Sequence, residues 1–282
     1  MRKNTFLLIV LMAYPAFAQV SSGTIIVINR TKDKVVVAAD SRGVNDNGAS
    51  PNNAYCKVSA FSHQFVFIAV GHASYAKAPI DLIESWDNAE LARDTIHAVP
   101  KKDDIAAYLI DLATYWGNTV GQHWDSLCKL NRPRCEKLVE TSNGILTDGI
   151  FIGPKTLLSG ATVSFDSGSF FNSVGYTTRT KLSQCWPCGQ EAGKEICVAG
   201  SHPDIAANIC AKRHRRDRIR TLAQLRNVDR DTRLPVQIVE STIAAYDKSA
   251  GDVGGPVDII SITTSGSIHW IKRKENCPEN QD

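Results

Sequence analysis

The chain has 282 residues, of which 43% are hydrophobic and 22% are charged, and its formal net charge is +3. These are ordinary values for a globular protein with one large domain or two small ones, and they point to no particular partner. The basic run at residues 212–220 lies in a helix-like stretch without interleaved aromatic residues. We therefore interpret it as a solvated face and expect no nucleic-acid partner.

The first 18 residues have the zones of a secretory signal peptide. Arg2 and Lys3 precede an apolar run at residues 6–12, and small residues end the segment at Ala16 and Ala18. We expect cleavage after Ala18 and export to the periplasm or the extracellular space. The apolar run is too short to span a bilayer, and no second apolar stretch of about 18 residues follows, so we expect no membrane association after cleavage.

The next residues alternate between β-rich runs and turn residues. The runs at residues 24–29 and 34–39 predict a hairpin, and a second pair at 57–61 and 65–70 predicts two more strands. Helices are expected at 73–92 and 103–120. The second of these has apolar residues at helical spacing, which indicates a core helix.

The second half of the chain predicts further strands, an insertion and a final hairpin. Strands are expected at 144–152, 156–165, 169–177 and 196–199, helices at 203–216 and 236–246, and a closing hairpin at 257–263 and 267–271. A Cys-rich insertion lies near 180–195. This order of elements predicts an α+β fold.

Eight cysteines in an exported chain favour disulfides. Cys128 and Cys135 flank a loop that contains proline and could bridge it, while four more gather at Cys185, Cys188, Cys197 and Cys210. Their pairing stays open. The Cys185-x-x-Cys188 pair has the form of a redox motif, but no βαβ pattern surrounds it, so a structural bridge is favoured over redox chemistry and over a four-cysteine zinc site. We expect no cofactor and no metal.

The most informative feature is a spaced set of four residues. Thr24 is followed by Asp40, at the end of the run Val-Ala-Ala-Asp-Ser-Arg, and then by Lys57 and Gly71. An N-terminal threonine carries a hydroxyl nucleophile and an amine base on one residue. It then needs a lysine to tune the amine and a backbone N–H to hold the oxyanion. This set therefore predicts threonine-type nucleophilic catalysis.

The order and spacing of these residues resemble the catalytic β-subunits of the proteasome and their bacterial relatives. Gly23 lies where that family cleaves its propeptide, Thr24 where it has its nucleophile, and Asp40 and Arg42 where it has its turn residues. The resemblance implies the four-layer αββα sandwich of the N-terminal nucleophile (Ntn) hydrolases. It also implies a propeptide at 19–23, removed by autoprocessing, and a single domain at 24–282.

The chain departs from the family pattern in two places. It has one residue more than the family between Arg42 and Lys57, and the acid and serine that flank the family's Gly-Gly pair fall on Ala250 and Val253. Asp247, Asp252 or Ser201 are candidates to replace them. Ser201 belongs to a Gly-Ser loop like that of the family, with a turn serine as the alternative interpretation.

The resemblance assigns a role to each residue at the site. Thr24 attacks an amide carbonyl, its α-amine accepts the proton, the Lys57 ammonium keeps that amine unprotonated, and the Gly71 N–H binds the oxyanion. Asp40 orients Lys57. Taken singly, each residue has a structural interpretation: a strand start, a turn pair, a surface lysine and a strand end.

His72 stands where the resembling enzymes have a second glycine, next to the expected oxyanion site. Substrate contact is one interpretation of His72, and a side chain turned to solvent is the favoured one. Gly23 likewise has an alternative role as an ordinary loop residue before a strand.

We expect an exported threonine-type hydrolase that cleaves amide bonds, most simply peptide bonds. Two alternatives remain open: a catalytically inactive binding or structural protein with the same fold, and an Ntn amidohydrolase that acts on small amides. A serine hydrolase is not supported, because no Gly-x-Ser-x-Gly motif occurs. No ATPase partner is expected outside the cytosol, and the oligomeric state is left open.

Overall fold

The computed structural model describes most of the expected domain. The described residues are 19–22, 24–45, 55–72, 74–76, 84–133, 135–136, 145–165, 178–183, 186–191, 194–200, 228–246 and 253–280. The signal peptide, the strand expected at 169–177 and the helix expected at 203–216 lie outside these residues. Within them, the chain forms antiparallel sheets and several helices, a mixed α/β architecture.

One sheet contains the strand that follows Thr24. Its six strands are, in spatial order, β12 (Trp186–Glu191), β13 (Lys194–Gly200), β2 (Ile25–Thr31), β3 (Lys34–Ala39), β14 (Asp258–Thr263) and β15 (Ile268–Lys272). The hairpins predicted at residues 24–39 and 257–271 are confirmed as the antiparallel pairs β2–β3 and β14–β15. The segment expected as a Cys-rich insertion supplies an edge strand, β12.

A second sheet contains the strands that carry Lys57 and Gly71 toward the site. Its five strands are, in spatial order, β11 (Thr178–Ser183), β10 (Leu158–Phe165), β9 (Ile145–Ile152), β6 (Phe65–Gly71) and β5 (Val58–Phe61). The predicted pair at 57–70 is confirmed as β5–β6. A short 3₁₀ turn, η1 (Pro154–Thr156), joins β9 to β10.

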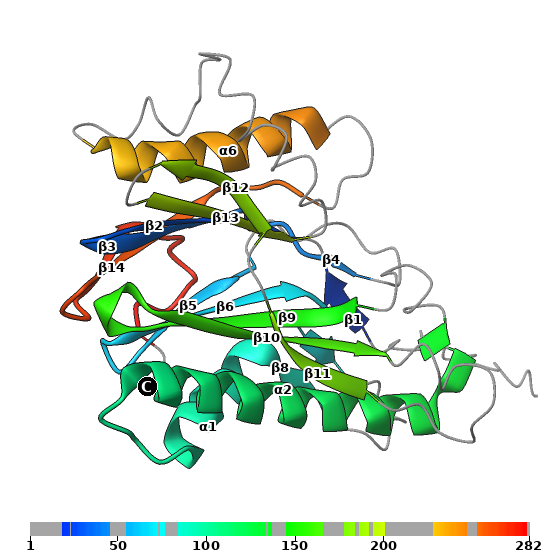
Figure 1. Cartoon of the computed structure of the whole chain (residues 1–282). Helices are drawn as coiled ribbons and strands as arrows, with labels where there is room; N and C mark the ends of the chain where they lie inside the picture. The colour runs from blue at the N-terminus through cyan, green and yellow to red at the C-terminus, as the bar shows by residue number, and fades with distance from the viewer. Residues whose placement is uncertain are drawn as a thin grey trace, which may run out of the picture.

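Apolar side chains of β2 alternate between two buried clusters. Ile25 and Val27 belong to a cluster shared with α6 (Arg230–Tyr246), and Ile26 and Ile28 to one shared with the five-stranded sheet. Successive side chains of a strand point to opposite faces, so both faces of this sheet are covered. Figure 1 shows α6 over the outer face of the six-stranded sheet and the second sheet beneath the inner face.

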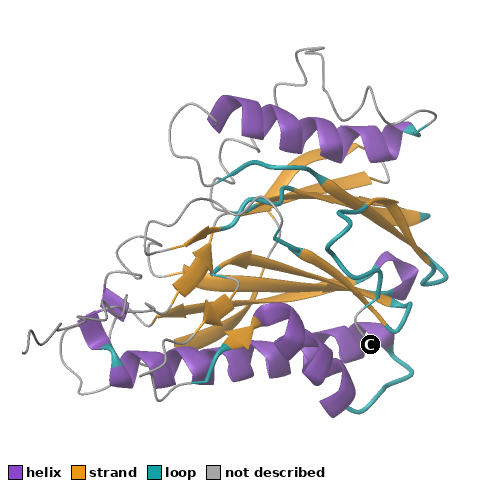
Figure 2. Cartoon of the chain, turned by 180° about the vertical axis from the view of Figure 1, so that it is seen from behind, coloured by secondary structure: helices purple, strands orange, loops and turns teal. Residues whose placement is uncertain are grey.

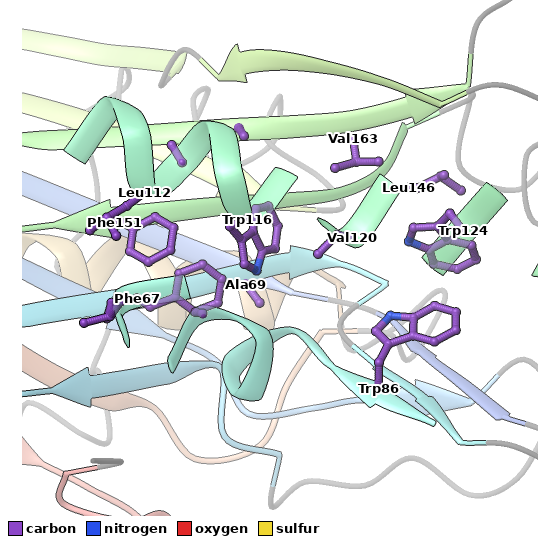
Figure 3. Close-up of a cluster of buried hydrophobic side chains, with 14 of the residues drawn as sticks. Phe67, Ala69, Trp86, Leu112, Trp116, Val120, Trp124, Leu146, Phe151 and Val163 are labelled. Carbon is purple, nitrogen blue, oxygen red and sulfur yellow. The ribbon is translucent and has the colours of Figure 1, made fainter. Parts of the chain in front are cut away.

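The outer face of the five-stranded sheet packs on two helices, α1 (Asn88–Ala98) and α2 (Ile105–Leu130). Figure 2 shows both helices along this face from behind. The Trp116 ring of α2 lies so close to Gly149 of β9 that an added Cβ would come within 2.4 Å of it. The centroid of the Phe67 ring lies 5.3 Å from that of Trp116 and 4.9 Å from that of Phe151 (Figure 3).

The helix predicted at residues 73–92 is wrong over its first part. Ser74–Ala76 form β7, which pairs on one side with β1 (Gln19–Ser22) and on the other with β8 (Trp86–Asp87). A further strand, β4 (Val44–Asn45), pairs with the free side of β1. Helix α1 begins at Asn88, where the Asp87 carboxylate caps two backbone N–H groups.

Two other predicted helices, those expected at 103–120 and 236–246, are longer than expected. Helix α2 continues to Leu130, and α6 begins at Arg230, upstream of Pro235. Proline has no N–H for the carbonyl of Asp231, one helical turn back. The Asn29 side chain donates to that carbonyl instead, at 2.7 Å, and this bond compensates for the missing one. Among the helices of the described residues, none is long and apolar enough to cross a membrane.

Candidate active site

Thr24 lies at the start of the six-stranded sheet and is buried, with 1% of its surface exposed. The next residue, Ile25, fixes the Asp40 turn beside it. The Ile25 N–H donates to Asp40 Oδ1 at 2.8 Å, and the Asp40 N–H donates back to the Ile25 carbonyl at 3.1 Å. The end of β3 and the beginning of β2 are therefore joined next to Thr24.

The Lys57 ammonium binds the same Asp40 oxygen, Oδ1, as the Ile25 N–H. The Lys57 Nζ lies 2.7 Å from Asp40 Oδ1, and the two side chains are only 1% and 0% exposed. Because the Ile25 N–H binds that oxygen too, the ammonium group lies next to the peptide that follows Thr24. A charge-assisted hydrogen bond of this kind fixes both groups in one geometry.

The Asp40 carboxylate has a third donor in the Gly254 loop. The Gly254 N–H donates to Asp40 Oδ2 at 2.8 Å, and the Gly254 carbonyl accepts from the N–H of Arg42 at 2.9 Å. A Cβ on Gly254, whose φ is +155°, would lie 2.5 Å from the Arg42 guanidinium carbon. Arg42 therefore packs on a position that only glycine fits. Val253, where the resembling family has a serine, is buried and carries no hydroxyl.

Gly71 ends β6 with a φ of +83°, and a Cβ there would lie 2.9 Å from the Leu146 carbonyl oxygen. The Val70 carbonyl points toward β9, because it accepts from Thr147 Oγ1 at 2.9 Å. In a trans peptide, the following N–H points the opposite way. The Gly71 N–H therefore points to the β5 side of the strand, where Ala69 already donates to the Lys57 carbonyl at 3.3 Å.

His72 is buried, with 7% of its surface exposed, and its ring lies 5.6 Å from that of Trp124. The favoured expectation that His72 turns to solvent is therefore wrong. The strong apolar packing of this region includes Trp86 and Trp124, which Figure 3 shows at one end of the cluster. Gly23, Ser201, Asp247 and Asp252 lie outside the described residues.

Sequence reasoning missed a second pair of buried charges beside the site. Lys274 donates to the Tyr55 carbonyl at 2.8 Å and forms an ion pair with Asp258 at the start of β14. Burial raises the pKa of Asp258 and lowers that of Lys274, because each charged form loses hydration, while their attraction acts the other way. Asp40 also raises the pKa of Lys274. No motif marks either residue in the sequence.

Two disulfides occur in the described part of the chain. Cys128–Cys135 closes the loop at the end of α2, as its spacing indicated. Cys56–Cys277 joins the residue before Lys57 to the C-terminal tail across a sequence separation of 221 residues. The cysteine count gave no signal for that pairing. Within the same residues, no group of three or more His, Cys, Asp or Glu side chains is arranged to hold a metal ion.

Comparison with known proteins finds only a weak structural likeness. No family model and no curated protein matches the chain. Among solved structures, the chain is similar to an Anbu (Gly-1) mutant from Hyphomicrobium sp. strain MC1. The sequence identity is 14%, the match covers 92% of this chain and 89% of that one, and the TM-score is 0.43. A likeness this weak carries no weight for function, which depends on the geometry described above.

Proposed function

We propose that the chain is an exported threonine-type hydrolase that cleaves peptide bonds, with Thr24 as its nucleophile after cleavage between Gly23 and Thr24. We also propose that its layers form the αββα sandwich of the Ntn hydrolases. The observation that carries the proposal is the shared oxygen of Asp40. It holds the buried Lys57 ammonium beside the backbone of Thr24.

The buried cation explains how the base works. Once residue 24 is the N-terminus, its α-amine has an ordinary pKa of about 8. A neighbouring ammonium disfavours a second positive charge, so it keeps more of this amine unprotonated at neutral pH. The amine then accepts the proton of the Thr24 hydroxyl as its oxygen attacks the substrate carbonyl. Asp40 keeps Lys57 charged by pairing with it in the interior.

The remaining steps follow from the same groups. The Gly71 N–H binds the negative oxygen that forms when Thr24 attacks. Collapse of this intermediate breaks the C–N bond, and the protonated amine of Thr24 gives its proton to the leaving amine. The resulting ester between Thr24 and the acyl group is hydrolysed by water, with the same amine as base. Before maturation the nitrogen of Thr24 is an amide and has no basic lone pair, so the precursor is inactive.

The strand that precedes Thr24 favours a peptide over a small amide as the substrate. In β1, Ser22 lies opposite Val44 of β4, and Val20 lies opposite Tyr75 of β7. The chain that enters Thr24 is therefore an extended strand paired on both sides. Removal of this segment would leave two strand edges for another extended peptide with its scissile bond at Thr24.

Export is part of the proposal. The N-terminal segment has the pattern of a signal peptide, and the two disulfides favour an oxidising compartment over the cytosol. A hydrolase held inactive until residues 19–23 are removed suits a protein that must cross a membrane before it acts.

Thr24→Ala tests the proposal directly. We expect the exported wild-type protein to begin at Thr24 by intact mass and to hydrolyse fluorogenic peptides, and the variant to keep its upstream residues and hydrolyse none. Thr31→Ala is the matched control, because Thr31 is a buried threonine at the other end of β2. Processing and hydrolysis that persist in Thr24→Ala would refute the assignment. A wild-type chain that begins at Gln19 and hydrolyses nothing would favour the inactive relative.

A further inference from the structure

Thr147 acts on the peptide group that carries the expected oxyanion donor. It lies on β9 directly opposite Gly71 and is fully buried. Its hydroxyl donates to the Val70 carbonyl at 2.9 Å. That carbonyl and the Gly71 N–H belong to one planar peptide group. The hydroxyl therefore fixes the direction of the Gly71 N–H and increases its polarity as a donor.

Asn88, the first residue of α1, holds Thr147 in turn. Its side-chain Nδ2 donates to Thr147 Oγ1 and to the His72 carbonyl, each at 3.0 Å. The Thr147 oxygen thus accepts from Asn88, and its own proton is directed to Val70. Asn88 is fully buried, and its backbone carbonyl accepts from Trp116 Nε1 at 3.1 Å.

We propose that Thr147 and Asn88 are positioning residues for the oxyanion donor, and this rests on the proposed function. Their hydrogen bonds run in one direction, from Asn88 to Thr147 to the Val70 carbonyl, and so to the N–H of Gly71. Hydrogen bonds in such a chain polarise one another in a low-dielectric interior. The carbonyls of the two neighbouring residues, Val70 and His72, are both held, which fixes the backbone around Gly71 and its positive φ.

The arrangement supplies donor strength without adding a charge. Neither side chain in this chain of donors, Asn88 or Thr147, is ionisable at neutral pH. A preorganised neutral donor aimed at the developing oxyanion stabilises the transition state more than the ground state, where the carbonyl carries less charge. Loss of the Thr147 hydroxyl should therefore lower kcat more than it raises KM.

Thr147→Val tests this with an almost isosteric change. We expect a fall in kcat of about tenfold, with KM changed by less than about twofold. Thr147→Ser keeps the hydroxyl and should restore kcat to within about threefold of wild type. Thr162→Val is the matched control, since Thr162 is on the neighbouring strand β10 and its hydroxyl binds Asp148 instead. It should leave kcat unchanged.

Two results would overturn the proposal: a folded Thr147→Val enzyme with wild-type kcat, or a Thr147→Ser enzyme as slow as Thr147→Val. If Thr147→Val does not fold, Asn88→Ala is measured in its place, because it removes the donor to Thr147 and leaves the Thr147–Val70 bond. A wild-type kcat in folded Asn88→Ala would then count against the proposal, and a fall in kcat with unchanged KM would support it.

A measurement without turnover separates this proposal from the proposed function. The Gly71 amide resonance is compared by NMR in Thr24→Ala and in Thr24→Ala combined with Thr147→Val. A shift of that resonance, with no shift when Thr162→Val is used, supports the positioning role even if the wild-type chain hydrolyses no peptide. An unchanged Gly71 resonance refutes it.

Discussion

The proposed active site has two sides, the Asp40–Lys57 pair and the Gly71 donor, and they are built from different interactions. On one side, Asp40 and Lys57 are buried charges that hold each other. On the other side, Gly71 is held by neutral hydrogen bonds from Thr147 and through it from Asn88. The chemistry explains the difference. A cation is needed to keep an amine unprotonated, whereas the oxyanion site needs donors that are strong without a counter-ion already bound.

The charged side extends beyond Asp40 and Lys57. Lys274 and Asp258 form a second buried pair next to the first, so that two cations and two anions gather between β3, β14 and the segment before β5. Their charges balance. Such a cluster is sensitive to the loss of any one member, because the remaining partner keeps a buried charge without compensation. The neutral side has no such penalty.

The largest effect on rate is expected from Lys57→Met. Loss of the ammonium should lower peptide hydrolysis about 10³-fold. About tenfold follows because an amine with its ordinary pKa of about 8 is mostly protonated at neutral pH, and the rest because the Asp40 turn loses its partner and no longer positions Thr24. Asp40 would keep an uncompensated buried charge, at a cost of about 3–5 kcal/mol in the free energy of unfolding. Kinetics and urea denaturation measure the two effects.

Lys34→Met is the control for Lys57→Met. Lys34 also pairs with an aspartate, Asp229, but at a more exposed position at the far end of β3. Its loss should cost less than about 1 kcal/mol and leave the rate unchanged. Equal loss of activity in both variants would mean that charge in general, and not Lys57 at this position, supports hydrolysis.

Gly71→Ala is expected to have the next largest effect on rate, on the neutral side. A Cβ would lie 2.9 Å from the Leu146 oxygen at a φ of +83°, so the strand end must move. Displacement of an oxyanion donor should cost about 10²-fold in kcat, and the strained backbone about 1–3 kcal/mol of stability. Kinetics and thermal melting report the two losses separately.

Gly266→Ala separates backbone strain from catalysis. Gly266 has a φ of +90° in the turn between β14 and β15, and its Cβ would approach only the flexible ring edge of Pro154, at 3.0 Å. This variant should lose a similar amount of stability and keep its kcat. If it also lost activity, the effect of Gly71→Ala would reflect instability alone.

The charged side was predictable and the neutral side was not, for a physical reason. Asp40 and Lys57 belong to a spaced motif of uncommon residue types, so the sequence indicated that they would meet. Thr147 and Asn88 are ordinary polar residues whose importance depends on register: Thr147 must lie opposite Gly71, and α1 must begin at residue 88. The pattern at residues 73–92 predicted a helix, whereas residues 74–76 form β7 and α1 starts only after β8, at Asn88.

In the fold, likewise, the sequence predicted local strand pairs but not the contacts between distant segments. β-rich runs separated by turn residues predicted β2, β3, β5, β6, β14 and β15, because each of these strands pairs with its neighbour along the chain in a hairpin. The pairing of Cys56 with Cys277, and of Lys274 with Asp258, joins segments that only the folded sheets bring together. No local pattern encodes such a contact.

A smaller effect is expected from replacing Lys274 by Met, which tests whether the second charge pair supports the first. The Lys274 ammonium binds the Tyr55 carbonyl, two residues before Lys57. We expect a fall in kcat/KM of less than about tenfold and a rise in the pH of its acidic limb, because less positive charge then surrounds the Thr24 amine. Lys274→Arg should restore the limb. An unchanged pH profile in Lys274→Met would confine Lys274 to a structural role.

The smallest effect on rate is expected from removal of the Cys56–Cys277 disulfide, which joins the residue before Lys57 to the C-terminal tail. Cys56→Ser with Cys277→Ser removes the tether beside Lys57, and Cys128→Ser with Cys135→Ser removes one at the end of α2. Chain entropy gives at most about 5 kcal/mol for the long loop and about 2.5 kcal/mol for the short one. We expect only the first double variant to lower peptide hydrolysis, by about two- to threefold, since backbone freedom at residue 56 loosens the Lys57–Asp40 contact. Equal rates in both double variants, measured where each is fully folded, would show that the buried ion pairs hold Lys57 without help from the tether.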